Sequence, residues 1–231
     1  MPPLTNRLDA PWLDAALHLL DRQVVDVDGK MVCNVDDLEL IEGAGGEMAV
    51  TGILVGAAAL VPRFSGRLGN WLRATWISLG AQYAARDVPL YLPLDLVEHV
   101  GSDVRIRVPR EGLLDRQPAS GPGTAQHRMD DFLGMDVVRD GERLGHVLDV
   151  RLQPRKQESR MLVVSLVVGR GRPGSLLGYD RGDFNGPALV KWAVTSLHRH
   201  SHLVPIESVR SVDWDAGRVE VSGPVEPLRT S

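Results

Sequence analysis

Apolar and polar residues alternate on both sides of two Asp-Gly steps, one in each half of the chain. The first step, Asp28-Gly29, lies within residues 20–40, and the second, Asp140-Gly141, lies within residues 133–152. Period-two alternation is typical of a strand with one buried face, and Asp-Gly favours a type I′ turn, in which both central residues have positive φ. The sequence therefore predicts a β-hairpin at each step.

A buried strand, a helix and a second hairpin are predicted after each of these hairpins. Residues 53–55 and 162–168 are rich in β-branched residues and predict buried strands. Helical spacing of apolar residues then predicts one helix per half: Leu68, Leu72, Trp76, Leu79 and Tyr83 in the first, and Leu189, Trp192, Ala193 and Leu197 in the second. A Leu-Pro and a Val-Pro step begin the last hairpins, because the residue before proline prefers an extended backbone.

The two halves match block by block, which indicates an internal duplication. In the hairpin blocks the valine pairs, the Asp-Gly steps and the last leucines align, with one extra residue before the turn in the first half. Three further blocks follow in the same order: 49–56 with 162–169, 92–97 with 204–209, and 104–108 with 219–221. Repetition of this kind is the signature of a duplicated structural unit. The short strands and single helix of each copy predict a small β-barrel rather than an open sheet.

The repeat sets the expected domain boundaries. We expect a first, more divergent barrel at residues 15–112 and a second at residues 128–224. Between them, residues 113–127 contain prolines and glycines without apolar periodicity, which predicts a flexible linker. Residues 225–231 are expected to be a frayed tail. The predicted fold class is mainly β with short helices, arranged as two small β-barrels in tandem.

The order of these blocks resembles the PRC-barrel family. The resemblance rests on a strand-Asp-Gly-strand opening, a Leu-Val-Val-rich middle strand and a closing Val-Pro-Ile-Glu-x-Val step, which residues 132–221 carry best. In residues 19–108 the clearest matching block is 90–95. The family fold occurs in the H subunit of photosynthetic reaction centres and in the C-terminal half of the ribosome maturation factor RimM. The resemblance implies small PRC-type barrels that dock to protein, RNA or a membrane complex, and it supplies no catalytic residues.

The composition is that of an ordinary folded protein. The chain has 231 residues, of which 43% are hydrophobic and 24% charged, and its formal net charge of −4 does not point to nucleic acid. Cys33 is the single cysteine and aligns with Gly145, so we expect no disulfide and a buried, inert thiol. The first residues lack the apolar core of a secretory signal, and the longest apolar run, 53–61, is too short to span a bilayer. We therefore expect a cytoplasmic protein, with attachment to the inner membrane surface left open.

Three short motifs resemble cofactor or metal sites, and each is incomplete. Residues 169–174 match G-x-G-x-x-G after a strand, but the residues that follow do not predict the helix that a dinucleotide site requires. His198, His200 and His202 could share a strand face and bind a metal, although a solvated helix end is the better explanation. Residues 26–29 begin like a calcium loop but lack its later glutamate, so a hairpin turn explains them. We therefore expect no cofactor, no metal and no catalytic residues.

Positive charge gathers between the middle strand and the last hairpin of each copy. Residues 62–86 hold arginines and tryptophans but no acidic residue, and residues 170–199 hold basic residues and a tryptophan against two aspartates. Basic residues interleaved with tryptophan suit anionic membrane surfaces or RNA phosphates. The alternative is that the tryptophans fill the barrel and the arginines form its solvated rim. The candidate partner-binding residues are Arg63, Arg67, Trp71, Arg73, Arg170, Arg172, Tyr179, Arg181 and Lys191.

These features favour a non-catalytic binding or adaptor protein over an enzyme. We expect the chain to dock a protein partner or membrane complex, or the anionic membrane surface itself, through the basic, Trp-containing faces. The alternative is an RNA- or ribosome-associated factor, by resemblance to the C-terminal domain of the maturation factor. An exposed β edge on each copy permits a homodimer, which the sequence does not require.

Overall fold

The computed structural model describes residues 6–56, 89–119, 121–170, 201–223 and 226–227. Over these ranges the protein is mainly β with short helices, which confirms the coarse fold class expected from the sequence. None of the described helices is long and apolar enough to cross a lipid bilayer. The helices expected at residues 68–83 and 187–197 lie outside the described residues.

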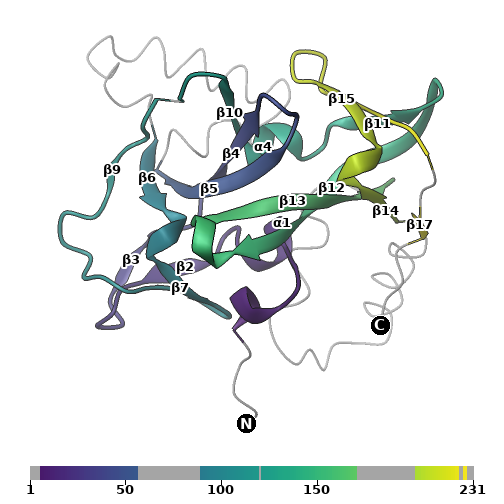
Figure 1. Ribbon diagram of the computed structural model, residues 1–231. Coiled ribbons are helices and arrows are strands. Elements are labelled where there is room, and N and C mark those ends of the chain that lie inside the picture. The colour runs from purple at the N-terminus through teal and green to yellow at the C-terminus, as the bar shows by residue number, and fades with distance from the viewer. Residues whose placement is uncertain (1–5, 57–88, 120, 171–200, 224–225, 228–231) are drawn as a thin grey trace, which may run out of the picture.

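The first half of the chain is a series of short strands that begins with a strand–helix pair (Figure 1). The expected buried strand at residues 53–55 forms the end of a longer strand, and the proline of the Leu-Pro step ends another. In chain order the elements are η1 (Arg7–Asp9), β1 (Leu13–Asp14), α1 (Ala15–His18), β2 (Gln23–Val25), β3 (Met31–Asn34), β4 (Asp37–Gly43), β5 (Met48–Val55), β6 (Leu90–Pro93), η4 (Leu94–Leu96), β7 (Val97–Val100), β8 (Val104–Ile106) and β9 (Asp115–Arg116).

The second half repeats this order of elements. A strand–helix pair again comes first, and one long strand, β12, takes the place of β3 and β4. The elements are β10 (Thr124–Arg128), α4 (Met129–Phe132), β11 (Asp136–Arg139), β12 (Glu142–Arg155), η5 (Lys156–Glu158), β13 (Arg160–Gly169), β14 (His202–Pro205), η6 (Ile206–Ser208), β15 (Val209–Asp213), β16 (Arg218–Val221) and β17 (Glu226–Pro227).

Strand pairing follows the same scheme in both halves. β2 pairs antiparallel with β3 and parallel with β8, as β11 pairs antiparallel with β12 and parallel with β16. The register corresponds too, because Val24 lies opposite Val104 and Val137 lies opposite Val219. β5 pairs with β4 and β6, as β13 pairs with β12 and β14. Among the described strands, hydrogen bonds do not close either set into a ring.

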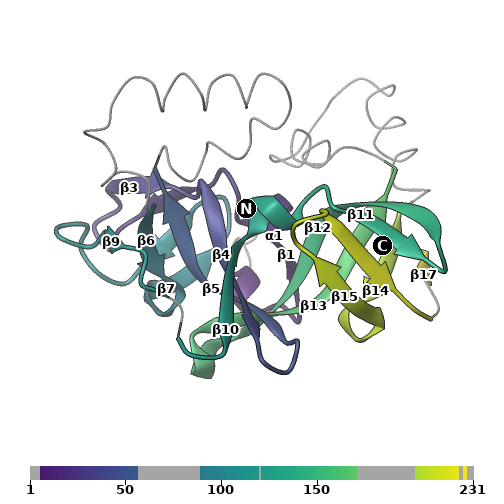
Figure 2. The same cartoon turned by 90° about the horizontal axis from the view of Figure 1, so that it is seen from above.

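The two halves meet in a 13-stranded sheet, whereas β3, β2, β8 and β7 of the first half form a separate 4-stranded sheet. β5 and β13 pair antiparallel, with Ala49 opposite Leu162 and Val50 opposite Met161. Ala49 and Leu162 open the aligned blocks 49–56 and 162–169, so the pairing is that of an approximate twofold axis perpendicular to the sheet. Figure 2 shows β3, β6 and β7 at one end of the molecule and β11, β14 and β15 at the other, with β1, β10 and β12 between them.

Each half sends a strand–helix arm onto the other half. The first arm, β1 and α1, pairs with β12 and places Leu13 opposite Leu152. The second arm, β10 and α4, pairs with β4 and places His127 opposite Leu40. Leu40 and Leu152 are aligned in the repeat, so the two arms dock at equivalent places.

The buried apolar side chains form one contiguous core drawn from both halves. Leu13 and Ala16 of the first arm and Met129 and Phe132 of the second belong to it, and none of the four is more than 2% exposed. The expected boundaries at residues 15 and 128 fall inside the two arms. Packing in this shared core therefore joins the two halves across the domain boundaries expected from the repeat.

The expected linker, residues 113–127, contains parts of two strands. β9 pairs with β6, placing Arg116 opposite Leu90, and β10 runs along β4. In the expected tail, β17 pairs with β14 as β9 pairs with β6. These strands lack apolar periodicity because they lie at sheet edges, where backbone hydrogen bonds rather than buried side chains hold them. Their sequences therefore look like linkers although they belong to the sheet.

The two Asp-Gly steps form different turns. Asp140 and Gly141 have φ values of 51° and 83°, as expected for the two-residue turn that joins β11 to β12. In the first step Gly29 has a φ of 75°, whereas Asp28 does not have a positive φ. The N–H of Gly29 donates to the carbonyl oxygen of Asp26 at 3.0 Å, which is typical of a longer loop that ends in a glycine. The type I′ prediction is therefore wrong for the first hairpin, where the extra residue lengthens the loop.

Gly145 of β12 lies against the backbone of Gly169 at the end of β13. A Cβ atom at position 145 would lie 2.4 Å from the carbonyl oxygen of Gly169. Cys33 occupies the aligned position of the first half and is buried. Burial, with a smaller effect of the Asp36 carboxylate, raises the pKa of its thiol to about 12, so the thiol stays protonated at neutral pH. This agrees with the inert cysteine that the alignment predicts.

Gly145→Ala is expected to lower the free energy of unfolding by about 1–3 kcal/mol, because the added methyl group forces the β12 backbone away from Gly169. Gly45→Ala is the matched control, since a Cβ atom at Gly45 meets no atom within 4 Å. Urea unfolding followed by circular dichroism measures both variants. Equal stability of the two would contradict the close approach of β12 to β13.

Candidate functional site

The two basic segments connect neighbouring strands at equivalent places. Residues 56–89 join β5 to β6, whose ends pair at Val55 and Leu90, and residues 170–201 join β13 to β14, whose ends pair at Val168 and His202. Antiparallel neighbours are ordinarily joined by about two to five residues. Each basic segment is therefore a long insertion into a hairpin that needs only a tight turn.

Of the candidate partner-binding residues, the structure describes Arg170. It is exposed and directly follows β13. The remaining candidates lie within residues 57–88 and 171–200, outside the described residues: Arg63, Arg67, Trp71, Arg73, Arg172, Tyr179, Arg181 and Lys191. Their gathering into basic faces stays a prediction.

The described ends of the segments are held in place by short contacts. After β5, the N–H of Gly56 donates to Oδ2 of Asp36 at 2.7 Å. After β13, the buried Ser201 lies close to Gly169, because a Cβ atom on Gly169 would lie 3.0 Å from the Ser201 hydroxyl oxygen. The second segment therefore starts and ends at neighbouring points, as the first does at the paired Val55 and Leu90.

The approximate twofold axis fixes where the two segments start. A twofold axis perpendicular to a sheet exchanges antiparallel neighbours but keeps the two faces of the sheet distinct. The connections that begin at Gly56 and Arg170 therefore start at opposite ends of the β5–β13 pair.

Two buried aspartates hold the arms onto the sheet. Asp149 of β12 accepts hydrogen bonds from the N–H groups of Ala16 at 2.7 Å and Leu17 at 3.1 Å, both in the first arm. Asp37 of β4 accepts one from the N–H of Asp130 in the second arm at 3.1 Å. Asp37 and Asp149 are aligned in the repeat. An acid kept at the same position of an apolar strand in both halves is the sequence signal for this role.

Burial raises the pKa of both aspartates to about 7. At Asp149 the nearby Asp14 carboxylate adds to the effect of burial, whereas the backbone N–H donors act in the opposite direction. At Asp37 the N–H of Leu38 opposes the effect of burial, and the Asp130 carboxylate adds to it. Oδ2 of Asp37 is buried without a hydrogen-bond partner among the described residues. These carboxyl groups therefore respond to pH near neutrality.

Glu39 of β4 is the centre of a separate polar cluster. Its carboxylate accepts from the Thr51 hydroxyl at 2.5 Å, from Nε2 of Gln117 at 2.9 Å and from Nε2 of Gln126. The Tyr91 hydroxyl donates to the carbonyl oxygen of Thr51 at 3.0 Å. Burial, followed by the charge of Glu39, raises the pKa of Tyr91 to about 12. These bonds are made within the cluster, and they fasten β10 and the 113–119 segment to the sheet.

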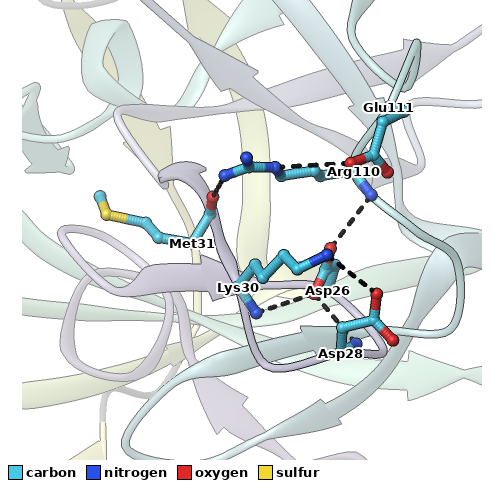
Figure 3. Close-up of polar contacts among 6 residues, drawn as sticks. All are labelled: Asp26, Asp28, Lys30, Met31, Arg110 and Glu111. Carbon is cyan, nitrogen blue, oxygen red and sulfur yellow. Dashed lines mark hydrogen bonds and ion pairs between the residues drawn. The ribbon is translucent and has the colours of Figure 1, made fainter.

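Asp26, in the sequence that resembles a calcium loop, organises the first hairpin. Its carboxylate accepts from the N–H groups of Asp28 at 3.0 Å, Lys30 at 2.8 Å and Arg110 at 3.2 Å (Figure 3). Burial favours a higher pKa for Asp26, but the three N–H donors outweigh it and lower the pKa. Asp28 instead pairs with Nζ of Lys30 at 3.2 Å. Asp26 therefore closes the loop and ties it to the strand exit at Arg110.

The other motifs lie only partly within the described residues. His202 is on β14 opposite Val168, whereas His198 and His200 are outside the described ranges. Gly169 ends β13, and all of its G-x-G-x-x-G motif beyond Arg170 is outside as well. In the part of the chain that the structure describes, no three or more His, Cys, Asp or Glu side chains gather to hold a metal ion.

Comparison with known proteins leaves the chain without an assigned family. No family model matches the sequence, and no curated protein matches it significantly. The resemblance to PRC-barrels therefore stays a prediction that rests on the sequence blocks.

The free energy of unfolding is expected to fall as the pH rises from about 4 to about 7. The native state keeps the Asp37 proton through this range, whereas the unfolded state releases it near the ordinary pKa of 3.8. Asp37→Asn removes this contribution, and its Oδ1 can still accept from Leu38 and Asp130. At pH 8 we expect this variant to be more stable than the original protein by up to about 4 kcal/mol. Chemical unfolding at pH 5 and pH 8 measures the difference.

Asp149→Asn is the contrasting variant. Both oxygens of Asp149 accept backbone N–H bonds, so an amide places its NH₂ group against an N–H donor such as that of Leu17. We expect its gain in stability at pH 8 to be smaller than that of Asp37→Asn. An Asp37→Asn variant that keeps the original pH dependence would contradict the raised pKa of Asp37.

Proposed function

We propose that the protein is a non-catalytic binding module built of two PRC-barrel-like units, which docks to a negatively charged membrane surface and the proteins embedded in it. The basic, Trp-containing segments 57–88 and 171–200 are its binding elements. The observation that carries the proposal is that both segments are inserted into the same hairpin of the repeated scheme, where a tight turn is sufficient.

The matching strand pairings support the two-unit interpretation. In each half a hairpin, a middle strand, a strand that ends in proline and a closing hairpin follow one another with corresponding registers. The first strand of each half also pairs parallel with the last strand of its closing hairpin. This recurrence is what a duplicated small barrel requires.

The sequences of the segments support a binding role. Residues 62–86 carry Arg63, Arg67, Arg73 and Arg86 and no acid, within a chain of net charge −4. Each basic residue near an anionic lipid surface contributes about 1 kcal/mol, and tryptophan prefers the membrane–water interface. Long connections on a rigid scaffold ordinarily carry residues that bind a partner, and they contribute little to the fold itself.

The placement of the segments supports a bivalent mode of binding. Both are inserted at equivalent paired strand ends of one scaffold, at Gly56 and Arg170. Two weak sites carried by one scaffold bind a continuous surface far more tightly than either site alone, because the second contact becomes intramolecular.

Vesicle sedimentation tests the proposal. We expect the protein to sediment at low salt with vesicles that contain phosphatidylglycerol but not with pure phosphatidylcholine vesicles, and to be released as the salt concentration rises. The triple variant Arg63→Glu/Arg67→Glu/Arg73→Glu is expected to bind at least about tenfold more weakly, because three favourable charge interactions become repulsive.

Arg155→Glu/Arg210→Glu/Arg218→Glu is the matched control. These arginines are exposed in the described structure and lie outside the two insertions in the sequence, and their reversal changes the net charge equally. Equal loss in both triple variants would show a response to net charge alone and contradict the role of residues 57–88. Absence of vesicle binding at low salt would contradict the membrane proposal. RNA binding that weakens steeply with salt would favour the ribosome-associated alternative.

A further inference from the structure

The two junctions between arm and sheet carry opposite charge patterns. In the first junction, Asp14 of β1 lies opposite Arg151 of β12. In the second, Arg128 of β10 lies opposite Glu39 of β4. The registers make Asp14 equivalent to Arg128, and Arg151 equivalent to Glu39. Acid and base have therefore exchanged places between two otherwise corresponding junctions.

The charges of the first junction are largely shielded from water. Nε of Arg151 donates to Oδ1 of Asp14 at 2.9 Å, and the two side chains are 14% and 13% exposed. The Arg151 guanidinium also lies over the Trp12 ring, 3.6 Å from its centroid. A shielded pair interacts much more strongly than a surface pair, so a like charge in place of Asp14 is strongly unfavourable.

The charge of the second junction is also buried. Glu39 is 3% exposed, and the hydrogen bonds from Thr51, Gln117 and Gln126 fix its carboxylate. A second carboxylate in place of Arg128 would face this fixed negative charge across the strand pair, where like charges are destabilising.

The alternative to this closure is an assembly in which like halves of two copies pair. In that assembly the first arm of one copy lies on β4 of the other, so Asp14 faces Glu39. The second arm lies on β12, so Arg128 faces Arg151. The apolar positions on the sheet do not separate the alternatives, because Leu40 and Leu152 are both leucines. At the register position of Asp14 and Arg128, charge distinguishes the two assemblies.

We propose that the exchanged charges direct each arm to the unlike half and exclude pairing of like halves between two copies of the chain. The surface of β12 accepts an arm with an acid at this register position, and the surface of β4 accepts an arm with a base. The chain thereby closes on itself, and Asp14, Arg151, Arg128 and Glu39 determine the specificity of that closure.

Two double variants with unchanged net charge test the proposal. Asp14→Arg/Arg128→Asp sets like charges against each other within one chain and makes like halves of two copies complementary. Asp14→Arg/Arg151→Asp keeps opposite charges at the first junction and leaves the second untouched. Light scattering after size-exclusion chromatography is expected to give a dimer or larger assembly for the first variant and the mass of the original protein for the second.

Thermal unfolding of the single variants provides a second measurement should the first double variant fail to fold. We expect Asp14→Arg to lower the Tm by about 10 °C and Asp14→Asn to lower it by about half as much, because only the former adds repulsion. Asp14→Arg/Arg151→Asp should regain at least half of the loss; the contact with Trp12 is not restored. Equal masses for both double variants, equal Tm values for Asp14→Arg and Asp14→Asn, or no recovery would each overturn the proposal.

Discussion

The reciprocal docking of the two arms is the constraint on which the rest of the fold depends. The sheet of each half is completed by a strand of the other, β1 on β12 and β10 on β4. Arm residues such as Leu13 and Phe132 are fully buried in the shared core, and Asp149 and Asp37 bind the backbone N–H groups of the arms. The pairing of β5 with β13 then follows at the centre, where equivalent residues meet. A repeated sequence thus produces one core.

Local pattern was enough to predict the hairpins, the middle strands and the correspondence between the halves, because alternation and turn residues act over a few positions. It failed where the partner strand is distant in sequence. Leu13–Asp14 is too short to show a period, and its partner is Leu152. Residues 124–127 were taken as linker, since an edge strand needs few apolar residues. The turn at Asp28-Gly29 differed because one extra residue changes the loop geometry.

Most of the candidate site lies outside the described residues. The basic segments were found by composition, and among their candidate residues Arg170 is described and exposed. The hairpins that carry them show why such segments are tolerated, because paired strand ends such as Val55 and Leu90 need no long connection. The roles of Asp37 and Asp149 escaped notice because their hydrogen-bond partners belong to the opposite half, which no local pattern reveals.

The separation between the first arm and its partner strand affects the order of events during translation. Leu13 and Ala16 leave the ribosome well before Leu152, beside which Leu13 finally lies. The first half therefore stays incomplete while the second is being synthesised, with apolar residues that have no surface to cover them. Pairing between distant segments is slow, and uncovered strands of this kind aggregate readily. The first half is thus most exposed to aggregation while the second half is still being made.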